Sequence, residues 1–263
     1  MNIQHSEITG RLLRREPPSQ LGVSTLKEAF RLLDEGKVKE AKDAVLYARQ
    51  EWEVVHDMYV NWAWSFFSYV ARTWGEEEME KAMRAVLSSY FRARYDKVMA
   101  SPVQTQLELT IEGLRGHLMG PGGMGEVEVV EEKDRYKLML TCSSGGKGRQ
   151  RIESGGEPFP ELFGFSEGPS PLTWGKKHVC HYCAHCALVN EIMAIEQYGH
   201  PMRITEYPAG KTADPSCVWY IYKDPKTIPA EYFERVGKTA PADAPRISST
   251  ESVQEAEANE THS

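Results

Sequence analysis

The first half of the chain carries apolar residues at a helical period. Over residues 37–74 they recur every three or four positions, and beyond Tyr59 nearly every position is apolar. This pattern predicts a long amphipathic helix that becomes fully buried towards its end. Further helices are predicted over 25–33, 76–99 and 103–118, so that residues 24–120 form a helical region.

The period changes to two after the breaker at residues 120–123. Alternating apolar and polar residues predict four strands in two pairs. A helix is expected between the pairs, and a short one after them. The strands are predicted over 126–131, 136–141, 202–207 and 217–222, and the helices over 184–198 and 228–236, within an α+β region of residues 121–238.

Three stretches lack a clear period. Residues 1–23 are expected to form an irregular leader, and residues 239–263 a disordered acidic tail. Residues 143–177 are rich in Gly, Pro and Ser but also hold four large aromatic residues. A loop of this length is usually functional or disordered, and the aromatic residues from Phe159 to Trp174 indicate that it folds over a substrate and shields it.

Together these elements predict an α+β protein. A helical bundle in the first half packs on a small antiparallel sheet in the second half, and the helix at 184–198 begins in a stretch rich in Cys and His. The breaker near Gly120 is short, so both halves are expected to share one core.

Charge and composition exclude several classes of protein. The chain of 263 residues has a net charge of −7, and the tail accounts for −4 of it, with five acidic residues against Arg246. No basic stripe with aromatic residues is present, so nucleic acid is not an expected partner. No apolar run is long enough to cross a membrane, and no secretory signal is evident. A cytoplasmic location is expected, and a homo-oligomer is compatible with the sequence.

The densest chemistry lies in the nine residues from His178 to Cys186. Six of these side chains are Cys or His, and three of the five cysteines of the chain occur here at Cys-x-x-Cys-x-x-Cys spacing. Residues three apart share one face of a helix or turn, so two thiolates can grip one ion. Thiolate and imidazole ligands favour zinc, copper and iron–sulfur clusters. The predicted metal ligands are Cys142, Cys180, Cys183, Cys186 and His185.

Two kinds of metal site remain open. Four thiolates would form a closed structural site, whereas three protein ligands would leave a position for water. Three local cysteines with a remote one, such as Cys142 at the end of a predicted strand, also suit an iron–sulfur cluster. The alternative without a metal is that these cysteines are small buried apolar residues.

A second group lies in the long helix. Glu53 and His56 are three residues apart and share a helix face, as in di-iron bundles, although only one such pair occurs here. Glu53 and His56, with His185, are the candidate catalytic residues, because a carboxylate or imidazole near a metal can act as a base for water. The alternative is a solvated polar pair.

The end of the chain resembles a known family. The segment 202–207, a turn with Gly210, and the segment 217–222 that starts at Cys217 are similar to the closing hairpin of L-2-amino-thiazoline-4-carboxylic acid hydrolase-like proteins and of 4-vinyl reductase-type small-molecule-binding domains. The resemblance covers about residues 103–223. It implies a pocket for a small organic molecule between a helical layer and an antiparallel sheet. The hydrolase family further implies attack of water on a C=N or amide-like bond.

The sequence therefore predicts a metal-dependent hydrolase, with zinc as the first candidate for the metal. An iron–sulfur redox protein and a non-enzymatic small-molecule-binding or sensor module with a structural metal are the alternatives. The Cys-His-Tyr-Cys-Ala-His-Cys run is richer in metal-binding side chains than expected for either family.

Overall fold

The structure is a computed structural model that describes residues 1–119, 126–140, 145–156, 158–208 and 216–247. The chain divides into two compact units, Met1–Met58 and Tyr59–Ser263. Helices dominate, and the described strands form one two-stranded and one four-stranded antiparallel sheet. The predicted α+β class is confirmed.

The first unit begins with a hairpin where an irregular leader was predicted. Strand β1 (Ile3–Ser6) pairs with β2 (Arg11–Arg14), and Gly10 takes a positive φ in the turn between them. Strands of four residues are too short to show a clear alternation, which is why the sequence pattern missed them. The helices of this unit are α1 (Pro18–Leu21), α2 (Thr25–Asp34) and the first part of α3 (Val38–Trp74).

Small residues let α2 and α3 approach closely in the first unit. Ala29 and Leu32 of α2 pack with Ala41 and Ala44 of α3 in a small buried cluster. The side chain of Arg14 donates a hydrogen bond to Thr25 Oγ1 at 3.2 Å and also pairs with Glu16. The hairpin is thereby tied to the start of α2.

The helices of the second unit match the predicted boundaries closely. Gly75, with a φ of 97°, separates the end of α3 from the next helix. Acidic residues occupy the first turn of that helix, where they complement the positive end of its dipole. The elements are the last part of α3, α4 (Glu76–Met99), α5 (Val103–Gly116) and a 3-10 turn, His117–Met119.

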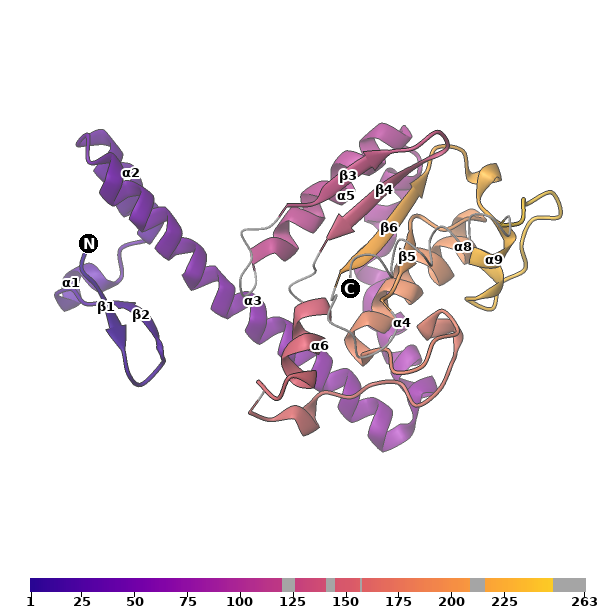
Figure 1. Cartoon of the computed structure of the whole chain (residues 1–263), viewed down its shortest axis with the longest axis horizontal. Helices are drawn as coiled ribbons and strands as arrows, with labels where there is room; N and C mark the ends of the chain where they lie inside the picture. The colour runs from indigo at the N-terminus through magenta and orange to yellow at the C-terminus, as the bar shows by residue number, and fades with distance from the viewer. Residues whose placement is uncertain (120–125, 141–144, 157, 209–215, 248–263) are drawn as a thin grey trace. The chain divides into compact units, whose positions relative to one another are not determined.

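The four-stranded sheet of the second unit has the order β3-β4-β6-β5, with antiparallel neighbours throughout (Figure 1). Leu140 at the end of β4 pairs with Cys217 at the start of β6. The strands are β3 (Glu128–Glu131), β4 (Arg135–Leu140), β5 (Ile204–Glu206) and β6 (Cys217–Tyr222).

Alternation along β6 sends its side chains to two different cores. Cys217 and Trp219 pack with Leu107 and Leu114 of α5 on one face. Tyr220 and Tyr222 pack on the other face with residues of α9 (Ala230–Glu234), which follows a 3-10 turn, Pro225–Thr227. Figure 1 shows α8 and α9 beside β5 and β6.

The segment that was predicted as a long loop contains a helix. Helix α6 (Gly145–Glu153) begins at two glycines and has few apolar residues, so no helical period marks it in the sequence. Two 3-10 turns, Pro160–Leu162 and Pro171–Thr173, follow it. Phe163 and Trp174 are buried in the core of the second unit.

The Cys- and His-rich stretch starts a helical segment, as predicted, but the helix is not uniform. Its middle is a π-helix, an arrangement that is often found at functional sites. Gly199 ends it with a φ of 81°. The parts are a 3-10 turn, His181–Cys183, then α7 (Ala184–Cys186), the π-helix Ala187–Ile192 and α8 (Met193–Tyr198).

No helix among the described residues combines the length and the apolar character that a bilayer crossing requires.

Candidate functional site

Four cysteines of the described part of the chain belong to the second unit. Cys180 precedes the 3-10 turn at the start of the helical segment and Cys183 is its last residue. Cys186 ends α7, and Cys217 starts β6. Cys180, Cys183 and Cys217 are buried, whereas Cys186 is half-buried. Cys180 and Cys183 lie in one buried cluster of the core, whereas Cys217 lies in the cluster that packs on α5.

The thiol of Cys183 is the centre of this group. Its pKa lies well above the usual value for a cysteine because of a hydrogen bond with Cys180 and because of burial. Charge on Cys180, Cys217 and Cys186 raises the pKa of Cys183 further, so these three sulfurs are within electrostatic reach of Cys183. Several thiolates in this region would need a cation beside them.

The start of α6 presses against the same thiol. A Cβ atom placed on Gly145 would lie 2.4 Å from Cys183 Sγ, a distance that real Cβ atoms do not show. Only a glycine at this position lets the backbone approach the sulfur so closely. The packing of α6 against Cys183 therefore explains why a glycine is the first residue of this helix.

Tyr207 and Arg149 border the thiols. The backbone N–H of Cys180 donates to the Tyr207 hydroxyl at 3.4 Å. The buried guanidinium of Arg149 lies 5.4 Å from the centre of the Tyr207 ring, and its Nη1 donates to the Pro208 carbonyl at 3.0 Å. A buried positive charge is thus separated from Cys180 by one aromatic ring.

His185 and Cys186 form a polar pair at the edge of the group. His185 Nε2 lies 3.5 Å from Cys186 Sγ, and His185 Nδ1 contacts the Tyr182 carbonyl oxygen at 2.5 Å. A carbonyl only accepts, so Nδ1 carries a proton and Nε2 faces the sulfur. Both residues are half-buried.

The two groups shift each other's pKa. Burial opposes the charge on His185, but the neighbouring Cys186 thiolate outweighs it and raises the pKa of His185 to about 9. Burial likewise raises the pKa of Cys186, and the positive charges of His185 and Arg203 outweigh it, so that the net shift is downwards. The pair favours thiolate and imidazolium.

Four of the five predicted metal ligands are described. Cys180, Cys183, Cys186 and His185 lie in this region, and Cys142 lies outside the described residues, so its role stays a prediction. Cys217 was given no role from the sequence. The pairing of Leu140 with Cys217 brings it to the end of β4, and a register for the two predicted strands would have revealed this. Across the described residues, no three or more His, Cys, Asp or Glu side chains are arranged to hold a metal ion.

Glu191 and Glu196, which follow the cysteines on the helical segment, are engaged elsewhere. Glu191 is fully buried and accepts hydrogen bonds from Trp174 Nε1 at 2.7 Å and from the backbone N–H of Thr205 at 2.8 Å. Glu196 pairs at the surface with Arg84. Both carboxylates have structural partners.

The candidate catalytic residues Glu53 and His56 belong to the first unit. His56 Nδ1 lies 3.1 Å from Asp57 Oδ1. The cysteines belong to the second unit, and each unit is a separate body. The catalytic role of Glu53 and His56 stays a prediction.

The aromatic residues of 159–174 pack on the core that contains Cys180 and Cys183. Phe163 and Trp174 are buried in that core, and the ring of Phe165 stacks on His178 at 4.2 Å. Phe159 is exposed. The segment thus covers the thiols with apolar side chains.

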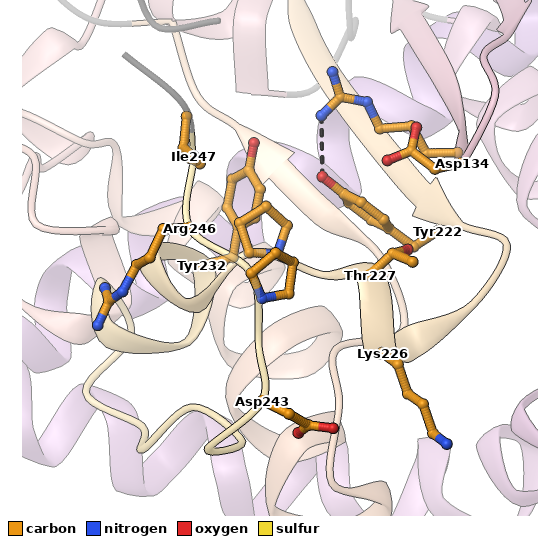
Figure 2. Close-up of a pocket in the computed structure, with 11 residues that line it drawn as sticks. Asp134, Tyr222, Lys226, Thr227, Tyr232, Asp243, Arg246 and Ile247 are labelled. Atoms are coloured by element: carbon orange, nitrogen blue, oxygen red, sulfur yellow. Dashed lines mark hydrogen bonds between the residues drawn. The ribbon is translucent and has the colours of Figure 1, made fainter.

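A cavity of about 470 Å³ lies on the other face of the sheet from Cys217. Tyr222 and Tyr232 are at its centre, and Arg135 Nη1 donates to the Tyr222 hydroxyl at 3.0 Å (Figure 2). In Figure 2 the side chains of Lys226 and Arg246 extend outwards from the rings. The lining combines the two tyrosines with charged side chains of both signs, which suits a polar small molecule better than an apolar one: Asp134, Arg135, Lys226, Asp243 and Arg246.

No protein-family model, no curated protein and no solved structure matches the chain. The resemblance of residues 103–223 to the two small-molecule families stays a prediction.

Proposed function

We propose that the second unit is a small-molecule-binding module whose core is stabilised by a soft metal ion or cluster. The donors would be Cys180, Cys183 and Cys217, with Cys186 at the edge. The observation that carries the proposal is the burial of cysteines from two segments: Cys180 and Cys183 share one core cluster, and Cys217 is buried at the start of β6. A cation among them would replace mutual repulsion by attraction.

The donor chemistry suits the group that it would hold. Thiolates select zinc or an iron–sulfur cluster over magnesium and calcium. Glycine at position 145 lets the backbone at the start of α6 approach Cys183 Sγ, where a Cβ atom would lie 2.4 Å away. A bound metal would tie the turn at Cys180 to the start of β6, and metal binding of this kind contributes directly to folding free energy. Zinc is the first candidate.

Burial favours a structural role over a catalytic one. Cys180, Cys183 and Cys217 are each at most 6% exposed. None of these three cysteines lines the cavity in Figure 2, so a small molecule bound there would not reach their sulfurs directly. We therefore assign ligand binding to the cavity and stabilisation to the thiols.

A metal-dependent hydrolase is the second candidate, and the pair of His185 with Cys186 favours it. These side chains are half-buried, so water can reach them. An open metal site activates water for hydrolysis. In this case His185 Nε2 would take or return a proton, and the substrate would carry a C=N or amide-like bond.

Elemental analysis with an absorption spectrum tests the metal. The full chain is purified without oxygen, and about one zinc per chain without visible absorption is expected. Iron and sulfide with absorption near ~400 nm would show a redox cluster instead. Absence of any metal, also after refolding with zinc under reducing conditions, would contradict the proposal.

Variants then assign the ligands. Cys183→Ser and Cys217→Ser are each expected to lose the metal. His178→Asn is the matched control, because His178 belongs to the same run, is largely exposed and stacks on Phe165. Asparagine tolerates the positive φ of 57° at this position. Loss of metal in Cys186→Ser but not in Cys217→Ser would favour the open site and the hydrolase.

A further inference from the structure

Helix α3, which runs through both units, carries a stripe of exposed apolar side chains. The helix has 37 residues, about three times the average length in globular proteins. A periodic helix of this length is typical of a coiled coil. In the part of α3 that belongs to the first unit, Val38, Val45, Trp52 and Val55 are exposed. In the part that belongs to the second unit, Tyr59, Trp62, Phe66 and Tyr69 are exposed.

These eight residues, here called the α3 seam, follow a seven-residue repeat. Two chains with such a repeat can bury their apolar positions against each other in a supercoil. The first d positions, Ala41 and Ala48, are buried within the first unit. The a positions of the repeat are Val38, Val45, Trp52, Tyr59 and Phe66, and the exposed d positions are Val55, Trp62 and Tyr69.

The opposite face of the helix is already used. In the second unit Trp64 and Ser68 are fully buried, and Ala71 packs on the same core. Residues 64, 68 and 71 have the spacing of one helix face. The seam residues 59, 62, 66 and 69 lie on the face that this packing leaves exposed. In the second unit α3 therefore has one covered face and one exposed apolar face.

Segments outside the described residues cannot supply the cover. Together they contain only two large aliphatic side chains, Met124 and Val253. The acidic stretch 248–263 is the longest of them and is otherwise polar. An apolar face of this extent needs an apolar partner.

We propose that the seam binds the seam of a second copy of this chain and forms a homodimer through α3. A second copy offers the same repeat, and therefore a partner of matching length and spacing. The five aromatic residues of the seam are between 54% and 64% exposed. With about 200 Å² for each aromatic side chain, they alone expose roughly 600 Å² per chain. A stable interface buries about 800 Å² per partner, and the three valines add to the aromatic area.

Light scattering with size-exclusion chromatography tests the dimer on the full chain. A mass of about twice 29.8 kDa is expected. The double variant Val45→Glu/Trp52→Glu places charges in the seam and is expected to give the mass of one chain. The matched control is Leu46→Glu/Val54→Glu, which replaces two exposed apolar residues of the same helix outside the seam, and the dimer is expected to persist.

A second measurement needs no variant. Trp52 and Trp62 are 60% and 64% exposed in the single chain, and a dimer would bury both. Tryptophan emission is expected to shift to longer wavelength on dilution, at the concentrations where the mass falls. A single chain at the highest soluble concentration would overturn the proposal. Equal loss of the dimer in both double variants would also overturn it, as would a single chain that binds phospholipid vesicles through the seam.

Discussion

Glu191 and Arg235 form an ion pair inside the second unit, with 3.0 Å between Glu191 Oε2 and Arg235 Nη2. The carboxylate is fully buried, and Arg235 also pairs with Glu206 of β5. The hydrogen bonds of Glu191 to Trp174 and Thr205 satisfy its other oxygen. One carboxylate thus joins the π-helix, the aromatic segment, β5 and the end of α9.

Replacement of Glu191 by Gln is expected to destabilise the protein by about 3 kcal/mol at pH 7, because a buried donor without an acceptor is costly. The amide of the variant would turn an N–H group towards donors from which the carboxylate now accepts: the Trp174 indole, the Thr205 backbone and the Arg235 guanidinium. Denaturant unfolding of the two proteins measures the difference. Glu196→Gln is the control, because Glu196 pairs with Arg84 at the surface and such pairs contribute at most about 1 kcal/mol. Equal effects of the two substitutions would contradict this prediction.

The same pair predicts a dependence on pH. Burial raises the pKa of Glu191 above its ordinary value near 4.5, against the opposing charge of Arg235. The folded protein therefore holds this proton more tightly than the unfolded chain. The stability that this tighter proton binding contributes is fully present below pH 4.5 and is lost as the pH rises from 4.5 through the raised pKa. The difference in unfolding free energy between the native chain and Glu191→Gln should thus shrink as the pH rises. A difference that grows with pH would show a lowered pKa.

The contact of Gly145 with Cys183 predicts a strict requirement for glycine. Gly145→Ala would place a Cβ atom 2.4 Å from Cys183 Sγ, so the sulfur or the start of α6 must move. Overpacking of this kind costs about 1–3 kcal/mol, and we also expect a lower metal content. Thermal unfolding and elemental analysis measure the two effects. Gly113→Ala is the control, because its Cβ would have no neighbour within 4 Å in the middle of α5. There alanine should stabilise by up to about 1 kcal/mol.

The sequence was sufficient for most of the second unit because its elements are long and regular. Helix α4 was predicted with its exact bounds, since acidic residues mark its start and Pro102 follows its end. Strand β6 was also predicted exactly from its alternation. The hairpin of β1 and β2 was missed because its strands are too short, and α6 because its glycines hide any helical period.

Local sequence spacing predicted only those residues of the candidate site that lie within one short segment. Local spacing identifies Cys180, Cys183 and Cys186, because neighbours in sequence remain neighbours in space. Cys217 depends on strand register, which no local pattern determines. The contact between Gly145 and Cys183 likewise joins residues that are 38 positions apart, so only the folded chain shows it.

Thiol reactivity should distinguish Cys186 from the other described cysteines. In a Cys142→Ser background, after treatment with chelator, one thiol is expected to react rapidly with a disulfide reagent at pH 7. Cys186 is half-buried, and the neighbouring His185 charge lowers its pKa although burial opposes this. Cys180, Cys183 and Cys217 are buried and should react slowly. Cys186→Ser should remove the rapid phase.

His185→Gln provides the control for the cause of that reactivity. Without the imidazolium at 3.5 Å, less of the Cys186 thiol ionises. The rapid phase should persist but slow, because a smaller fraction of the Cys186 thiol is ionised at pH 7 when its pKa rises. An unchanged rate would mean that accessibility alone, and not His185, makes Cys186 reactive.

Among single substitutions in α3, replacement of Trp64 is expected to lower the free energy of unfolding the most. Its ring is fully buried, packs edge-to-face on Phe163 at 5.2 Å, and its Nε1 donates to the Gly164 carbonyl at 2.8 Å. Trp64→Ala would leave a large cavity and should cost about 4 kcal/mol. Trp74→Ala is the matched control, since Trp74 is the same residue type on the same helix but is 60% exposed. It should cost under about 1 kcal/mol, because surface substitutions have small effects. Denaturant unfolding compares the two, and equal losses would mean that Trp64 does not hold the 163–165 segment against α3.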